Sequence, residues 1–331
     1  MRISVLDQCP IPEGATAGVA LRNTIELARL ADRFGYARYW LAEHHGTPGL
    51  ACSSPEVLIG PVAAATSRIR VGSGGVMLPH YSPLKVAENF SMLAGMFPGR
   101  IDLGIGRAPG TSARVAFALQ RDRRQAAPDD FREQLDELLG YLAPSAAAGG
   151  PFRQAPAMRF DPVEIALLGS SPQSAIWAAE LGLPYVFADF INPEGAPIAA
   201  CYRETFRPSR LLEKPRVSVA VWAIAAETSE EALRLSSSAR MMMLLLFRGQ
   251  LIPVPPVEKA IEFLSREGLP AGSLPQRRRM ITGDPESVRR SIEAVAREYG
   301  AEEVFIVNIL HEHFARLRCY EFIAKAFGLR T

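Results

Sequence analysis

Residues 69–106 read IRVGSGGVMLPHYSPLKVAENFSMLAGMFPGRIDLGIG, and their pattern decides the fold class. The stretch predicts a strand over Ile69–Met77, a helix over Pro83–Met96 and a second strand over Ile101–Ile105, because apolar or β-branched runs flank an amphipathic segment. A strand, a helix and a strand in this order form one βα unit of a parallel sheet.

The same alternation extends along the rest of the chain. Six further segments have the length and composition of strands: Ile3–Leu6, Arg38–Leu41, Glu164–Leu168, Tyr185–Phe187, Val217–Ile224 and Val304–Val307. Segments with helical periodicity lie between or after them: Ala20–Phe34, Pro55–Thr66, Asp130–Leu142, Pro172–Leu181, Pro197–Phe206, Ser229–Leu246, Val257–Glu267, Ser287–Tyr299 and Phe314–Phe327. Eight strands with intervening helices fit a closed (β/α)8 TIM barrel, and a doubly wound open sheet is the structural alternative.

Three stretches interrupt this rhythm, and we interpret them as loop insertions. Segments after the carboxyl ends of barrel strands lie over the active-site face, so Arg107–Pro128 and Arg248–Pro256 are expected near a ligand. Pro144–Pro162, rich in Ala, Gly and Pro, is expected to be an insertion loop and not a domain linker. One domain is therefore expected over residues 1–331, and a hydrophobic content of 48% is sufficient for its core.

Composition argues against several classes of partner. The chain has 37 basic and 35 acidic residues without a long run of one charge, which argues against nucleic-acid binding. No stretch approaches the roughly 18 unbroken apolar residues of a membrane helix, and the N-terminus enters a strand at once and not a secretion signal. The cysteines are far apart in sequence and are expected to be isolated thiols in a reducing compartment: Cys9, Cys52, Cys201 and Cys319. We therefore expect a cytoplasmic location.

The strand Arg38–Leu41 is followed closely by Glu43, His44 and His45. Titratable residues at the carboxyl end of a barrel strand occupy the usual place of catalytic groups. A histidine exchanges protons near neutral pH because its unperturbed pKa is about 6.5. The structural alternative is that one histidine packs at the strand end while the other faces solvent, but the position favours a catalytic role for at least one.

The strand Ile69–Met77 carries three glycines in its middle, Gly72, Gly74 and Gly75. Glycine inside a strand marks either a β-bulge or a place where a ligand approaches the backbone closely. The sequence alone gives these two interpretations equal weight.

Arg107 follows the strand Ile101–Ile105 and a glycine, in a pattern that superficially suggests a dinucleotide fingerprint. The glycine spacing differs from that fingerprint by one residue, and Pro109 disfavours an immediate helix, so we reject a Rossmann site. Arg107 remains a fixed cation suited to a phosphate or carboxylate.

The strand Glu164–Leu168 runs into the turn GSSPQS at 169–174, where Pro172 is expected to begin a helix. The free N–H groups and partial positive charge of a helix start suit a phosphate, and nearby serine hydroxyls add donors. The structural alternative is an ordinary serine cap of the helix.

In combination and in this order, these segments closely resemble the bacterial-luciferase-like family of flavin-dependent monooxygenases. The matching pieces are LAEHH (41–45), VGSGGVMLPHYSPLKVAENF (71–90), FPGRIDLGIGRAPGT (97–111), LLGSSPQSA (167–175), ELGLPYVFA (180–188), FRPSRLLEKPRVSVAVWAIAAET (206–228) and ITGDPESV (281–288). The resemblance covers nearly the whole chain and rests on the long combination and not on any single piece.

The resemblance implies a (β/α)8 barrel with FMN lying across the carboxyl ends of the strands. The residues that would hold its phosphate are Gly169, Ser170, Ser171 and Ser174, with Arg107 opposite them. The family often has a non-proline cis peptide beside the isoalloxazine, and the matching bond joins Gly74 and Gly75. Relatives place a histidine near the reactive flavin carbon, and His44, not His45, is the matching one.

The implied activity is that of an oxidoreductase in which reduced FMN, supplied as a co-substrate by a separate flavin reductase, and O2 oxidise a small organic molecule. Luciferase-type members carry a cysteine where this chain has Gly106, which argues against light emission. Two alternatives stay open, hydride transfer with a deazaflavin and a flavin-binding barrel without turnover. Relatives commonly form homodimers, here through Pro55–Thr66 and Pro83–Met96, and no metal site is expected.

Overall fold

The computed structural model describes residues 1–107, 112–120, 123–125, 129–143, 162–269, 272 and 278–329. Its strands are β1 (Arg2–Asp7), β2 (Arg38–Leu41), β3 (Arg70–Met77), β4 (Ile101–Gly106), β5 (Glu164–Gly169), β6 (Tyr185–Ala188), β7 (Val217–Ala225), β8 (Ile281–Gly283) and β9 (Glu303–Val307). Its helices are α1 (Ala17–Arg33), α2 (Pro55–Ala64), α3 (Pro83–Met96), α4 (Ala113–Leu119), α5 (Phe131–Tyr141), α6 (Pro172–Leu181), α7 (Ala196–Thr205), α8 (Ser229–Phe247), α9 (Val257–Arg266), α10 (Pro285–Tyr299), α11 (His313–Ala326) and the short 3-10 helix η1 (Leu78–His80).

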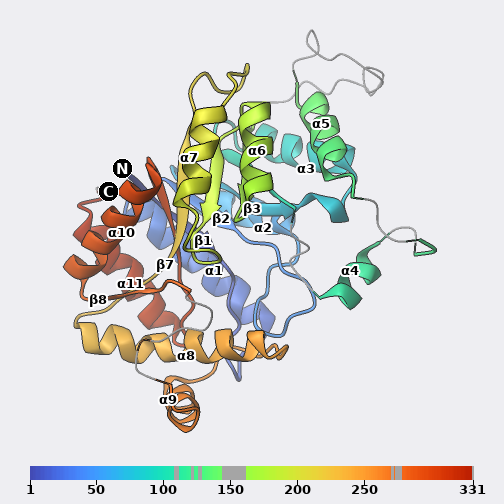
Figure 1. The fold of residues 1–331 in the computed structure, drawn as a ribbon. Helices are drawn as coiled ribbons and strands as arrows, with labels where there is room; N and C mark the ends of the chain where they lie inside the picture. The colour runs from blue at the N-terminus through green and yellow to red at the C-terminus, as the bar shows by residue number, and fades with distance from the viewer. Residues whose placement is uncertain are drawn as a thin grey trace.

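Eight of these strands close into a parallel barrel (Figure 1). The ring runs from β1 through β6 in chain order, continues to β7 and β9, and returns to β1. The closing pairs are parallel, with Tyr185 opposite Val217 between β6 and β7 and Ile3 opposite Val304 between β1 and β9. Closure confirms the (β/α)8 barrel and excludes the open doubly wound sheet.

The eight strands expected from the sequence are the eight strands of the ring, and three further elements were not expected, the short 3-10 helix η1, β8 and α4. The short strand β8 pairs with the end of β7, where Ala223 lies opposite Ile281, outside the ring. Helix α4 lies within the interruption Arg107–Pro128 and has no buried residue, so it lacks the amphipathic pattern that marks a helix in sequence. The loop expected over Pro144–Pro162 lies almost entirely outside the described residues.

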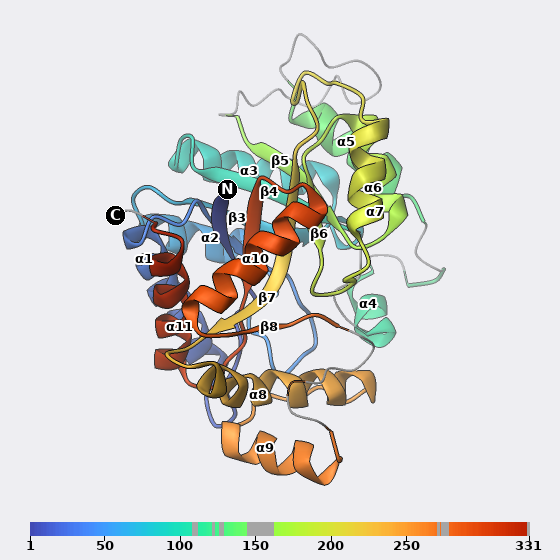
Figure 2. The same cartoon turned by 60° about the vertical axis from the view of Figure 1, so that its left-hand side comes forward.

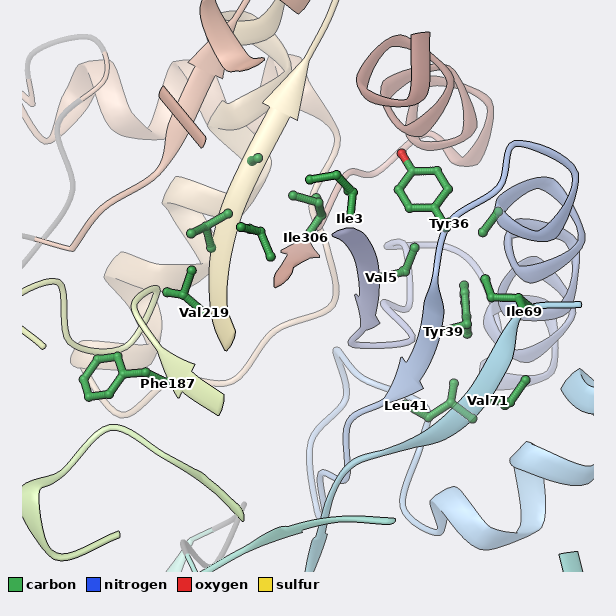
Figure 3. Packing of buried hydrophobic residues seen from close by; sticks show 14 of the residues in the cluster. Ile3, Val5, Tyr36, Tyr39, Leu41, Ile69, Val71, Phe187, Val219 and Ile306 are labelled. Atoms are coloured by element: carbon green, nitrogen blue, oxygen red, sulfur yellow. The ribbon is translucent and has the colours of Figure 1, made fainter. Parts of the chain in front are cut away.

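Apolar side chains form one layer outside the ring and another inside it. The outer layer fills the space between strands and helices, and Figure 3 shows part of it, including Val5, Tyr39 and Val71. The inner layer fills the barrel with these side chains: Leu6, Trp40, Ala42, Ala166, Val186, Ala220, Phe305 and Val307. Alternation along each strand separates the two layers, because successive side chains point to opposite faces.

The amino end of the barrel is closed by buried charges. Arg38 lies inside the ring with a side chain only 5% exposed, and it contacts carboxylates of three other strands. Its distances are 2.6 Å to Asp102, 2.9 Å to Glu164 and 3.1 Å to Glu303. Trp40 donates to the same Asp102 carboxylate at 2.9 Å, which links this charged layer to the apolar layer above it.

Helix α8 lies across one end of the barrel, with α9 on its outer side, in both Figure 1 and Figure 2. Val254, between these two helices, forms a bridge with Pro12, so the segment Arg248–Pro256 runs beside the loop that follows β1. In the part of the chain that the structure describes, no helix is both long and apolar enough to cross a membrane.

Replacing Arg38 with Met should destabilise the fold by about 3–5 kcal/mol, because it leaves buried carboxylates without their cation. Urea denaturation followed by circular dichroism measures the loss. Arg29→Met, on the exposed face of α1, is the matched control and should stay within about 0.5 kcal/mol of the wild type. A similar small effect of Arg38→Met would show that the charged layer does not hold the barrel.

Candidate functional site

A pocket of about 420 Å³ lies at the carboxyl ends of the strands. Its volume is within the range of about 300–1,000 Å³ that small-molecule and cofactor sites occupy. The residues that line it come from β1 to β7, from the loops that follow them and from α6: Leu6, Gln8, Ala42, Glu43, His44, Gly74, Gly75, Met77, Gly106, Arg107, Leu168, Gly169, Ser170, Ser171, Ser174, Trp177, Val186, Ala188, Phe190, Ile191 and Ala220. This is the face on which barrel enzymes carry their active sites.

All of the site residues expected from the sequence line this one pocket: His44, Gly74, Gly75, Arg107, Gly169, Ser170, Ser171 and Ser174. The residues that sequence reasoning missed are mainly inward-facing strand positions such as Ala42, Val186 and Ala220. Successive side chains of a strand point to opposite faces, and this alternation is the signal that could have identified them. It shows which residues face inward only when the closure of the ring is known.

One end of the pocket, which we call the anion end, is formed by Arg107, Ser170, Ser171 and the first turn of α6. Pro172 begins α6, and the N–H groups of that turn have no helical carbonyl partners. Ser171 precedes the helix but makes no capping hydrogen bond, so the interpretation of this turn as an ordinary serine cap is wrong. The helix start is left open to an anion.

The hydroxyl groups of this turn are not equivalent. Ser174 is buried and donates to the carbonyl oxygen of Ser171 at 2.8 Å, while the hydroxyl of Tyr185 lies 2.9 Å from its Oγ. The hydroxyl of Ser174 therefore has protein partners that fix the turn. Ser170 and Ser171 are more exposed, and the amide of Asn192 donates to the carbonyl oxygen of Ser170 at 3.1 Å.

Arg107 is exposed at the end of β4, and its guanidinium lies over the ring of Trp177 at 5.5 Å from the ring centroid. Trp177 belongs to α6 and lines the same pocket. Within the described residues, no carboxylate pairs with Arg107. The stacking on Trp177 restrains the guanidinium beside the helix start, where it can contact a phosphate.

The other end of the pocket, which we call the histidine end, includes His44, Gly74 and Gly75. The bond between Gly74 and Gly75 is cis, as the resemblance implied. A Cβ atom on Gly75 would lie 2.7 Å from the carbonyl oxygen of Gly104, so the close approach of β3 and β4 requires glycine there. The ladder between these strands also shifts between Ser73 and Val76. The glycines thus lie both in an irregular strand and in the pocket wall, and the close approach of a ligand to them stays a prediction.

His44 is only partly exposed, and its Nδ1 atom is buried without a hydrogen-bond partner in the described structure. Burial, together with the positive charge of His45, lowers the pKa of His44 to about 4. The imidazole is therefore neutral at pH 7. An unpaired polar atom in a pocket wall is costly unless a ligand or water satisfies it.

His45 lies behind this wall and does not line the pocket. Its Nε2 atom is 2.6 Å from Oε1 of Glu43, and its ring meets the ring of His80 edge to face at 5.6 Å between centroids. The structure thus separates the two histidines as the resemblance implied. A catalytic role for His44 stays a prediction.

Two of the cysteines are not isolated as expected. Cys9 and Cys52 are both buried, and burial together with a hydrogen bond to the Cys52 thiol raises the pKa of Cys9. The backbone between them is also joined, because Ala51 donates to the carbonyl oxygen of Cys9 at 2.8 Å. The loops after β1 and β2 bring them together, a contact that spacing along the chain cannot reveal.

The residues present fit a flavin mononucleotide. The anion end offers a cation, helix N–H groups and hydroxyls to a phosphate, while the histidine end offers a glycine wall and apolar side chains to an uncharged ring. The unpaired Nδ1 of His44 gives that ring or a substrate one polar partner.

Solved structures share this architecture. The structure of apo-MsnO8 is similar, with 41% identity and a TM-score of 0.89 over 99% of this chain and 98% of that one. The oxygenating constituent of 3,6-diketocamphane monooxygenase of Pseudomonas putida, in complex with FMN, has 19% identity and a TM-score of 0.71 over 98% of this chain and 97% of that one. At 19% identity the second likeness shows the fold alone.

Similar sequences also extend over nearly the whole chain. A luciferase-like monooxygenase of Escherichia coli (strain K12) is 39% identical, covering 96% of this chain and 94% of that protein. The N-acetyl-S-alkylcysteine monooxygenase of Bacillus subtilis (strain 168) is 36% identical, covering 98% of each. The family model described as luciferase-like monooxygenase matches residues 1–303. This chain therefore belongs to the luciferase-like monooxygenase family.

Proposed function

We propose that this protein is an FMN-dependent monooxygenase that takes reduced FMN from a separate reductase and uses O2 to oxidise a small organic molecule. The observation that carries the proposal is one pocket in which an anion end with Arg107 and a histidine end with His44 face the same space. Reduced FMN, when bound, supplies the electrons that activate oxygen.

The residues of this chain bind, orient and shield. Arg107, Ser170, Ser171 and the start of α6 would hold the phosphate of FMN. The wall of Gly74 and Gly75 would orient the ring, and the apolar strand ends would exclude water from it. The neutral imidazole of His44 can accept a proton from a substrate or donate a hydrogen bond to it.

The proposal is tested by supplying the purified protein with FMN, NADH and an independent flavin reductase, and by measuring binding of reduced FMN and oxidation of a substrate panel under 18O2. We expect saturable binding of reduced FMN and transfer of one 18O atom to a product. Thioether carboxylates belong in the panel, because the N-acetyl-S-alkylcysteine monooxygenase is a relative. Turnover with reduced deazaflavin in the absence of oxygen would overturn the assignment, as would binding without any turnover.

Replacing Arg107 with Ala should weaken FMN binding about 10- to 100-fold, the contribution of a charge-assisted hydrogen bond, and should leave riboflavin binding nearly unchanged. Fluorescence titration with each flavin measures the two affinities. Arg33→Ala, at an exposed position of α1, is the control for general charge effects. Equal losses for both flavins would remove Arg107 from the phosphate site.

Replacing His44 with Ala should leave FMN affinity nearly intact, because the phosphate contacts lie at the other end of the pocket. Product formation should fall about 10²–10⁴-fold, the usual contribution of a positioned acid or base, while oxygen is still consumed and released as hydrogen peroxide. The measurement is the ratio of product to hydrogen peroxide. His45→Ala should change this ratio much less, and identical behaviour of the two variants would contradict the role of His44.

We further propose that the protein forms homodimers through α2 and α3. Val57 on α2 is 70% exposed, and Met92 and Met96 on the neighbouring α3 are each 59% exposed, which favours burial against a second copy. Light scattering should give twice the mass of one chain. Met92→Glu should shift the protein to monomers, whereas Phe314→Glu, at a position of α11 that is 74% exposed, should not. A monomeric wild type would contradict the proposal.

A further inference from the structure

We propose that Glu43 is a positioning residue that holds the carboxyl end of β3 in place and thereby shapes the histidine end of the pocket. The inference deepens the proposed function, on which it rests, because it assigns the isoalloxazine of FMN to this end of the pocket. It concerns a residue whose side chain has no part in the phosphate contacts.

Glu43 is a fully buried carboxylate with a defined partner for each oxygen. Oε2 accepts the backbone N–H of Met77 at 3.0 Å, and Oε1 lies 2.6 Å from Nε2 of His45. Oε1 of Glu43 and Nε2 of His45 share one hydrogen bond. The carboxylate is thus held between the loop after β2 and the last residue of β3.

The hydrogen bond from the N–H of Met77 to Glu43 takes the place of a backbone hydrogen bond between β3 and β2. The ladder between β2 and β3 ends where Leu41 lies opposite Ser73, but β3 continues for four more residues and pairs only with β4. Beyond Ser73, β2 no longer pairs with β3, so a backbone N–H on that edge of β3 needs another acceptor, because a buried donor without a partner costs free energy. The side chain of Glu43, two residues after the end of β2, provides that acceptor.

The held segment is part of the pocket wall. Gly74, Gly75 and Met77 all line the pocket, and both glycines lie between the last β2–β3 pair at Ser73 and the Glu43 contact at Met77. The β3–β4 ladder is irregular between Ser73 and Val76, so this segment has weaker support from β4 than a regular strand has. Two fixed points, the pair at Ser73 and the bond at Met77, therefore set the position of the wall.

Two other titratable groups lie close to Glu43. Burial, the negative charge of Glu43 and a hydrogen bond to its carboxylate raise the pKa of Tyr81, and Glu56 also lies close enough to feel that charge. Burial also raises the pKa of Glu56, whose Oε2 atom is buried without a partner in the described structure. Glu56 forms no hydrogen bond to β3 and is the matched control for a neighbouring carboxylate.

The test compares Glu43→Ala, Glu43→Gln and Glu56→Gln in flavin titrations of the full chain. Glu43→Ala should weaken FMN and riboflavin binding equally, each about 10-fold or more, because the lost contact acts on the ring end and not on the phosphate. Glu43→Gln keeps an oxygen acceptor for Met77 and should stay within about threefold of the wild type for both flavins. Glu56→Gln should change neither affinity.

Backbone amide exchange of the flavin-free protein gives an independent measure of the same contact. In Glu43→Ala the segment 74–78 should exchange faster, while β1 and β7 keep their protection, and Glu43→Gln should restore the slow exchange. Unchanged exchange and unchanged flavin affinity in Glu43→Ala would overturn the inference, as would a loss in Glu43→Gln as large as in Glu43→Ala. A wild type that binds neither FMN nor riboflavin would instead overturn the proposed function, so the two failures are distinct.

Discussion

The burial of one guanidinium inside the barrel is the constraint on which the rest of the structure depends. Arg38 lies where most barrels place apolar side chains, and it is compatible with the interior only because carboxylates of β4, β5 and β9 contact it. Arg216 and Arg70 also contact the carboxylate of Glu164, which spreads the charge over several strands. This layer closes the amino end of the ring, so space for a ligand remains at the carboxyl end.

A second buried ion pair holds the carboxyl end in place. Asp7, the last residue of β1, contacts Arg316 of α11 at 2.5 Å and accepts the hydroxyls of Thr24 and Tyr39. It also accepts a hydrogen bond from the backbone N–H of Cys9 at 2.7 Å. This bond fixes the turn of the chain after β1, in which Gln8 lines the pocket. Removing one partner of a fully buried ion pair strongly destabilises a fold, because the other charge is left buried without a counter-ion. The intact pair itself adds little net stability.

Much of the fold and the membership of the pocket could be predicted from sequence, because both follow from short-range patterns. Alternating strand and helix signals predicted the eight ring strands, and the expected site residues lie within the β3 strand, at or after the ends of β2, β4 and β5, or in the first turn of α6. What could not be predicted depends on which strands become neighbours. The pairing of Glu43 with Met77 requires knowing where the β2–β3 ladder stops, and the contact of Cys9 with Cys52 requires two loops to meet. Helix α4 escaped detection because it buries nothing.

The two ends of the pocket differ in charge, and this difference bears on how an anionic ligand is oriented in it. Burial keeps His44 neutral, since its pKa is about 4, so His44 adds no positive charge to the histidine end. The anion end combines the charge of Arg107 with the partial positive charge at the start of α6, and Arg107 has no carboxylate partner among the described residues. The anion end therefore favours an anionic group, and the histidine end favours an uncharged one. A protonated His44 would offer an anionic group a second position in the pocket. The low pKa of this histidine therefore keeps the charges of the two ends different.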